Sequence, residues 1–156
     1  MKNILLLTDF SEAADSATDY AVHWANALNC DITLYHVYQV YSSTGSFISV
    51  ERYIIDDLER DMGKALKKIR AALNPGLNAT AKYAKGDPIP TLSKIAGREE
   101  YDLVIMGNHG GGSRTSIFWG TTTSGVVHKT NANLLAVPDS YQFKEVKNIV
   151  LIIDDE

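Results

Sequence analysis

Residues 101–125 read YDLVIMGNHGGGSRTSIFWGTTTSG, and they indicate the fold class most directly. An apolar run at the start of this stretch has the length of a buried strand and ends at Gly107. Glycines 110–112 follow, and Gly120 then precedes the hydroxyl-rich run 121–124, which is suited to begin a helix. Glycines let the main chain approach an anion, and a helix N-terminus offers unpaired N–H groups. The pattern indicates a phosphate or nucleotide site; the alternative is a surface connection.

The glycine spacing excludes two common phosphate loops. No Gly-Lys-Ser or Gly-Lys-Thr closes the loop, as a Walker motif requires, and the glycines lie too far apart for the dinucleotide fingerprint. The observed pattern is Gly107-x2-Gly110-x9-Gly120-Thr121. This pattern resembles the ATP-binding signature of the universal stress protein family.

Composition narrows the function classes further. The chain has 156 residues, of which 45% are hydrophobic and 22% charged, as expected for one folded domain with at most a remnant of another. Its net charge of -4 disfavours a nucleic-acid partner. Cys30 is the single cysteine, so no intramolecular disulfide or cysteine-rich metal site is expected. The N-terminal apolar run is too short for a signal peptide or membrane span, so we expect a cytoplasmic protein without a membrane partner.

Hydrophobic periodicity predicts alternating strands and helices. The apolar run 4–7 indicates a strand covered on both faces, as at the centre of a parallel sheet. Ser11 is a suitable N-cap for a helix through Leu28, and Asn74-Pro75-Gly76 ends a second, longer helix. Five strands alternating with four helices give an open, doubly wound parallel α/β sheet with helices on both faces. The other expected strands are 31–38, 79–83, 101–106 and 134–138; the other helices begin at Pro88 or Pro90 and span about 121–130.

The resemblance to the universal stress protein family extends over nearly all of residues 1–138. It implies an adenine nucleotide alpha hydrolase-like fold with strand order 3-2-1-4-5. Ligands of such sheets bind at the carboxyl ends of the strands, where the winding direction reverses, so Asp9 and Gly107 should face each other. The matching segments, in order, are ILLLTDFS at 4–11, LYHV at 34–37, GDP at 86–88, DLVIMGNHG at 102–110 and LLAVP at 134–138.

The end of the chain repeats its beginning. KNILLLTD at 2–9 is echoed by KNIVLIID at 147–154. The repeat predicts the first domain of a tandem protein, with a nucleotide-binding domain at 1–140, a linker at 141–146 and the first strand of a truncated second domain at 147–156. The alternative is a C-terminal strand added to the sheet. In either case we expect this apolar segment to pair with a sheet edge of its own or a neighbouring chain.

The resemblance implies a site for ATP with Mg²⁺ or Mn²⁺ held mainly by the phosphate oxygens. We expect no catalytic residue, because no carboxylate or lysine is apparent near the expected γ-phosphate. Asp9 is suited to accept hydrogen bonds from ribose hydroxyls, although an isolated Asp at this place could equally form an Asx-type turn. His36 is expected to pack or to cap backbone groups rather than to bind a ligand. By resemblance, Leu7 and Thr8 border the base, Val37 meets adenine, Met106 and Gly107 wall the ribose, and Gly110, Gly120, Thr121 and Thr122 bind the phosphates.

Two departures from the family pattern bear on the phosphate site. Gly111-Gly112 stand where many members carry a basic residue, which leaves Arg114 as the nearest cation. Gly125 costs the following helix about 1 kcal/mol relative to alanine. Both features predict a weaker or less rigid phosphate site.

Three functions remain open from the sequence. The first is an ATP-binding sensor or regulator of the stress response. The second is an interaction module that binds no nucleotide and forms a homodimer through the edge strand 134–137, or pairs with a second tandem domain. The third is a slow ATPase, against which the scarcity of catalytic groups counts, since His109 could act as a base but could equally cap the loop. The glycine signature favours the ATP-binding sensor or regulator.

Overall fold

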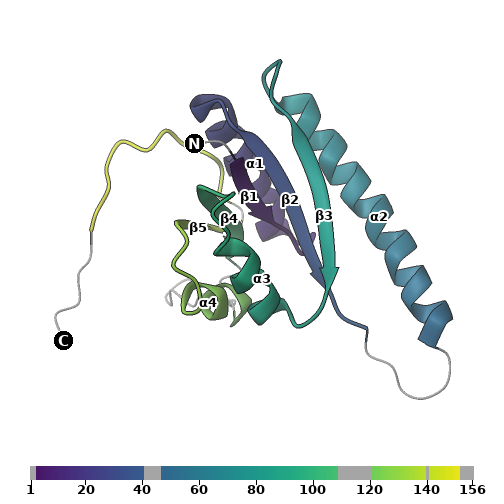
Figure 1. Cartoon of the computed structure of the whole chain (residues 1–156). Helices are drawn as coiled ribbons and strands as arrows, with labels where there is room; N and C mark the ends of the chain where they lie inside the picture. Colours follow the sequence, from purple (N-terminus) through teal and green to yellow (C-terminus); the bar gives the residue numbers. More distant parts are fainter. Residues whose placement is uncertain (1–2, 41–46, 109–120, 140, 152–156) are drawn as a thin grey trace, which may run out of the picture.

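The computed structural model describes residues 3–40, 47–108, 121–139 and 141–151. Strands and helices alternate along the chain, and the strands lie side by side in one sheet with helices on its two faces (Figure 1). The elements are β1 (Asn3–Leu7), α1 (Glu12–Leu28), β2 (Asp31–Tyr38), α2 (Phe47–Ala72), β3 (Ala79–Lys85), α3 (Pro88–Ala96), β4 (Leu103–Asn108), α4 (Thr121–Val127) and β5 (Leu134–Pro138).

The sheet confirms the predicted topology. Its order is β3-β2-β1-β4-β5, and every pair of neighbouring strands is parallel. The last residue of β1, Leu7, is in register with Tyr35 on one side and Met106 on the other. The chain winds outward from β1 to β3 and then crosses to β4, so the winding reverses between β1 and β4. A crevice for a ligand is expected at the carboxyl ends of these two strands.

Two apolar clusters, one on each face of the sheet, explain why β1 is apolar from Ile4 to Leu7. Successive side chains of a strand point to opposite faces. Ile4 and Leu6 belong to the cluster formed with α1 and α2, whereas Leu5 and Leu7 belong to the cluster formed with α3 and α4. All four side chains are at most 3% exposed. A central strand with both faces covered has no place for a polar residue.

The predicted helix starts are confirmed at α1 and α3. The Ala14 backbone N–H donates to the Ser11 hydroxyl over 3.3 Å, and the Ile89 N–H donates to the Asp87 carboxylate over 3.3 Å, with Pro88 in the first turn of α3. These caps satisfy N–H groups that the helices themselves leave free. Both helices therefore start at the carboxyl end of the sheet.

Some boundaries differ from those expected. The fourth strand begins at Leu103 rather than Tyr101, because Tyr101 is still held in a turn by the Arg98 carbonyl. The long helix α2 already begins at Phe47, and α4 ends at Val127.

Gly125 has a packing role that could not be inferred from its low helix propensity. A Cβ atom at this position would lie 2.7 Å from Ile89 Cδ1, closer than packed carbon atoms approach. The glycine therefore allows α4 to pass directly against α3, and this close packing offsets its poor helix propensity.

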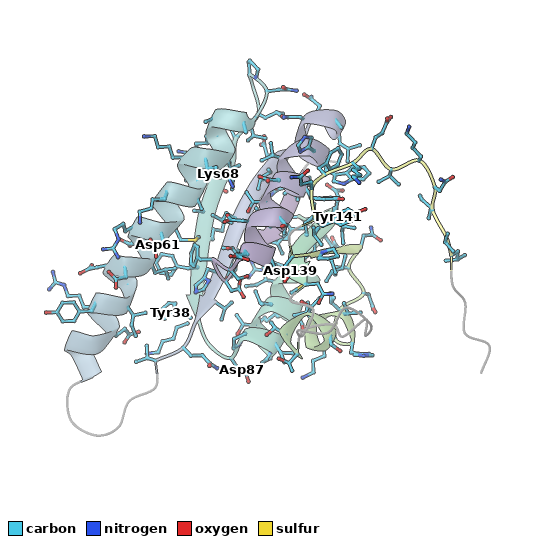
Figure 2. All side chains as sticks on the ribbon, turned by 180° about the vertical axis from the view of Figure 1, so that it is seen from behind. Tyr38, Asp61, Lys68, Asp87, Asp139 and Tyr141 are labelled. Atoms are coloured by element: carbon cyan, nitrogen blue, oxygen red, sulfur yellow. The ribbon has the colours of Figure 1, made fainter. Side chains whose placement is uncertain are left out.

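The segment after β5 is anchored to α1 and then leaves the body of the protein. The Phe143 ring stacks on His23, with centroids 4.1 Å apart, and packs edge-on against Tyr20 at 5.0 Å. Residues 147–151 form no strand, and Ile149, Val150 and Leu151 are between 79% and 89% exposed (Figures 1 and 2).

The predicted pairing of this segment with a sheet edge of its own chain is therefore wrong for residues 147–151, because these residues form no strand and three of their apolar side chains are exposed. Pairing with a neighbouring chain, and the predicted domain division at 140 and 147, remain predictions.

Candidate functional site

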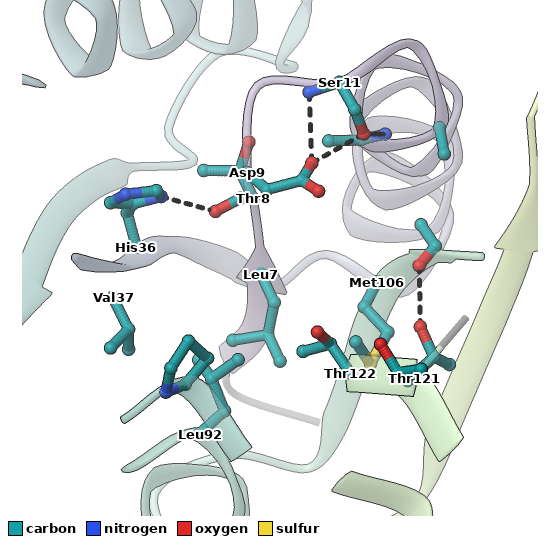
Figure 3. A pocket seen from close by; sticks show the side chains of 15 residues that line it. Leu7, Thr8, Asp9, Ser11, His36, Val37, Leu92, Met106, Thr121 and Thr122 are labelled. Carbon is teal, nitrogen blue, oxygen red and sulfur yellow. Dashed lines mark hydrogen bonds between the residues drawn. The ribbon is translucent and has the colours of Figure 1, made fainter. Parts of the chain in front are cut away.

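A pocket opens at the carboxyl ends of β1, β2 and β4, where the first turns of α1, α3 and α4 converge (Figure 3). Its volume is about 250 Å³, just below the range of roughly 300–1,000 Å³ that is usual for ligand pockets. The side chains or backbone of the following residues line it: Leu7, Thr8, Asp9, Ser11, Ala13, Ala14, His36, Val37, Pro88, Leu92, Met106, Gly107, Thr121, Thr122 and Thr123.

The pocket gathers every predicted site residue that the structure describes. These residues come from four separate elements or their flanks, namely Leu7, Thr8, Asp9, Val37, Met106, Gly107, Thr121 and Thr122. Gly110 and Gly120 lie outside the described residues, as do His109, Arg114 and the glycines 111 and 112.

Sequence reasoning missed the other lining residues. The sequence does identify Ser11 as a helix cap, and that role could have placed Ser11 at the pocket. A helix that starts at the end of a central strand also starts where the ligand binds. Leu92 and Thr123 become part of the site only through the packing of α3 and α4 on the sheet. The missed residues are Ser11, Ala13, Ala14, His36, Pro88, Leu92 and Thr123.

One wall of the pocket is apolar and preformed. Leu7, Val37, Leu92 and Met106 contribute to it from β1, β2, α3 and β4, and each is at most 9% exposed. They belong to the core cluster under α3 and α4, so their positions are determined by packing. A wall of this kind suits a flat, apolar ring system.

The opposite wall is polar and is formed around Asp9. Oδ1 of its carboxylate accepts hydrogen bonds from the backbone N–H and the hydroxyl of Ser11, over 3.0 and 2.5 Å. The Asx-type turn considered for this residue is thus formed. Among the residues that the structure describes, these bonds engage Oδ1, so Oδ2 can accept a hydrogen bond from a ligand that lies in the pocket. A turn and a ligand contact are compatible at this carboxylate.

Gly107 brings α1 and β4 into contact at the floor of the pocket. A Cβ atom here would lie 2.5 Å from the Ala13 carbonyl carbon and 2.8 Å from the Ala14 backbone nitrogen. Because these are backbone atoms, no side-chain movement could relieve the clash. The glycine is therefore required by the packing of α1 on β4, whatever the ligand.

The start of α4 is tied to the same point. The Thr123 hydroxyl, 3% exposed, donates to the Gly107 carbonyl over 3.0 Å. This bond places the preceding residues, Thr121 and Thr122, at the pocket beside Met106 (Figure 3).

The pocket contains little formal charge. Among the described lining residues, the Asp9 carboxylate is the only aspartate, glutamate, lysine or arginine. Across the described residues, no group of three or more His, Cys, Asp or Glu side chains could hold a metal ion. In the same part of the chain, no helix is both long and apolar enough to cross a membrane.

Known proteins share this fold over almost the whole chain. Universal stress protein MJ0577 of Methanocaldococcus jannaschii is 27% identical over 87% of this chain and 94% of its own length. The solved structure of universal stress protein UspA from Lactobacillus plantarum superimposes with a TM-score of 0.71, at 25% identity, over 87% of this chain and 97% of that one.

Two more distant solved structures carry adenine nucleotides. A universal stress protein family protein from Arabidopsis thaliana with AMP bound has a TM-score of 0.64 at 16% identity, over 90% of this chain and 93% of that one. A universal stress protein in complex with cAMP has a TM-score of 0.65 at 18% identity, over 89% and 98% of the two chains. The profile of the Universal stress protein family matches residues 1–138, and this chain therefore belongs to the universal stress protein family.

Proposed function

We propose that this protein binds ATP in the pocket at the carboxyl ends of β1, β2 and β4 and acts as a nucleotide-dependent sensor or regulator of the stress response. The observation that carries the proposal is the convergence of an apolar wall, the Asp9 carboxylate and the Thr121 and Thr122 hydroxyls around one pocket. These features suit the base, the ribose and the phosphates respectively.

The described half of the pocket supports an adenosine moiety. The adenine ring would lie against Leu7, Val37 and Leu92, where its edge can reach backbone groups of Val37. Asp9 Oδ2 would accept hydrogen bonds from the ribose hydroxyls, as acidic residues do in other nucleotide-binding sheets. The AMP and cAMP complexes of the distant relatives agree with an adenosine site in this fold.

The phosphates would extend toward Thr121 and Thr122 and toward the predicted contacts at Gly110 and Gly120. Because Asp9 is negative and the described lining has no lysine or arginine, a triphosphate needs its charge balanced from elsewhere. The first turn of α1 adds no positive charge, because it carries Glu12 and Asp15 and its Ala14 N–H is bonded to Ser11. Mg²⁺ or Mn²⁺ held mainly by the phosphate oxygens would supply this balance, so ATP binding should depend on the metal.

The test is calorimetric titration of the purified, nucleotide-free protein with ATP in the presence and absence of Mg²⁺, with AMP and GTP as comparisons. Metal-dependent binding that favours ATP over GTP supports the proposal. Replacing Thr121 and Thr122 together by alanine should weaken ATP binding by about 10-fold or more while changing AMP binding less. The matched control is Thr80→Ala on β3, an exposed threonine outside the pocket.

The second candidate is an interaction module that forms a homodimer through β5 and binds no nucleotide. It is favoured by the position of β5 at the edge of the sheet, where one side of the strand lacks a neighbour in this sheet. Folded protein that binds none of the nucleotides but self-associates would establish this function instead. Slow ATP hydrolysis would appear as phosphate release in the same samples.

A further inference from the structure

His36 holds the end of β1 from the neighbouring strand. Its Nδ1 lies 2.7 Å from the carbonyl oxygen of Thr8, and the Thr8 backbone N–H donates to the Tyr35 carbonyl over 3.0 Å (Figure 3). A carbonyl oxygen can only accept a hydrogen bond, so Nδ1 must carry the proton. An imidazole side chain thus continues the connection between β1 and β2 beyond their last paired residues, Leu7 and Tyr35.

Phe10 holds the other side of the same turn. Its ring packs on His36 with centroids 4.9 Å apart, and its backbone N–H donates to the Thr8 hydroxyl over 3.0 Å. The φ angle of Phe10 is 61°, which a residue with a side chain adopts only where its surroundings impose it. His36 and Phe10 therefore determine together the conformation of Thr8, Asp9 and Phe10.

Asp9 lies between these two attachments, and its Oδ1 is already bound by Ser11. We infer that His36 is a positioning residue for the ligand's ribose: by holding the Thr8 carbonyl it orients the Asp9 carboxylate, so that Oδ2 discriminates ligands by their ribose hydroxyls. This inference rests on the proposed nucleotide function and extends it to the origin of sugar selectivity. His36 itself does not need to touch the ligand.

The chain offers a matched control. His23 on α1 also places Nδ1 2.7 Å from a carbonyl oxygen, that of Asp19, and also stacks on an aromatic ring, Phe143. It lies outside the pocket. His36→Leu and His23→Leu therefore remove the same kind of contact, and only the first should affect the ribose. In His36→Asn, the side-chain amide can donate from nearly the place of Nδ1.

The experiment measures the dissociation constants of ATP, 2′-deoxy-ATP and 3′-deoxy-ATP for each variant. Loss of a ribose hydroxyl should weaken binding to the wild type and to His23→Leu by about 10-fold or more. In His36→Leu this penalty should fall below about 3-fold, and His36→Asn should restore most of it. Asp9→Ala should also abolish the penalty, and the double variant Asp9→Ala/His36→Leu should show no additional change.

An unchanged deoxynucleotide penalty in His36→Leu would overturn the inference while leaving nucleotide binding intact. An equal loss of affinity for all three nucleotides would also overturn it, because His36 would then support the pocket as a whole. No binding to the wild type would overturn the proposed function and the ribose role together.

Nitrogen-15 NMR of the ligand-free protein tests the hydrogen bond even where His36→Leu fails to fold. We expect the neutral His36 ring to carry its proton on Nδ1, and a proton on Nε2 instead would contradict the hydrogen bond to Thr8.

Discussion

At the scale of single residues, Asp9 combines a structural and a proposed binding role in one carboxylate. Asp9→Asn keeps an oxygen that can accept from Ser11 and removes the charge. We expect ATP affinity to fall by about 10-fold or more, because a hydrogen bond from a ribose hydroxyl to a charged group is worth roughly 1.5–3 kcal/mol. The free energy of unfolding should change by less than about 1 kcal/mol.

Calorimetry and urea denaturation measure these two quantities. Asp56→Asn is the control for the change in net charge, since Asp56 is exposed on α2 and lies outside the pocket. Equal or tighter ATP binding by Asp9→Asn would show that repulsion between Asp9 and the phosphates outweighs any bond to the ribose.

Tyr101 makes the stability of the protein sensitive to alkaline pH. Burial and then the neighbouring Glu100 raise the pKa of Tyr101 to about 12, from an ordinary value of 10.0. Among the described residues, its buried hydroxyl has no hydrogen-bond partner. Because the folded state binds the proton more tightly, this contribution to stability is complete below pH 10 and is lost as the pH rises from 10 toward 12.

Tyr101→Phe should therefore flatten the decline of the free energy of unfolding over this pH window, by at most about 1.4 kcal/mol per pH unit. Urea denaturation of both proteins at pH 8, 10 and 11 provides the comparison. Parallel declines in the two proteins would mean that other groups account for the alkaline loss.

At the scale of elements, the contact between α1 and β4 depends on a glycine. Gly107→Ala places a methyl group against the backbone of Ala13 and Ala14, so the helix must shift. We expect the free energy of unfolding to fall by about 1–3 kcal/mol. Gly63→Ala is the control, because nothing lies within 4 Å of a Cβ atom there and alanine favours the helix by up to about 1 kcal/mol.

Urea denaturation should move the two midpoints in opposite directions. If Gly107→Ala were as stable as the wild type, α1 would have to be free to move away from β4, and the floor of the pocket would not be rigid.

Much of the element pattern was predictable from local sequence. Ser11 and Pro88 indicated helix starts because such signals act over a few residues, and the apolar run 4–7 indicated a strand with both faces covered. The exact start of β4 was not predictable, because it depends on whether Tyr101 joins the strand or the preceding turn.

At the scale of the whole molecule, the exposed apolar residues 149–151 predict self-association of the protein. Ile149, Val150 and Leu151 expose 79–89% of their surface, and their sequence repeats that of β1, in which Ile4 to Leu7 are at most 3% exposed. We expect residues 147–151 to pair with a sheet edge of another copy. Replacing Ile149 and Val150 by lysine should raise the dissociation constant for self-association by about 10-fold or more.

Sedimentation velocity over a range of concentrations measures this change, with Glu145→Lys as a control for added positive charge in the same segment. Identical association by the wild type and the double variant would assign self-association to another surface, such as β5, or show that the segment stays unpaired. Nucleotide binding should be the same in all three proteins.

The sequence by itself determined the alternation of strands and helices, the caps and the buried central strand, because these follow from residues close together in the chain. Resemblance to a known family supplied the strand order and the proposed nucleotide contacts. Only the tertiary structure showed that His36 reaches Thr8, that Leu92 lines the pocket, and that Gly125 lies against Ile89. These contacts join residues far apart in the sequence, and they arise from strand register and helix packing, which no local pattern of residues specifies.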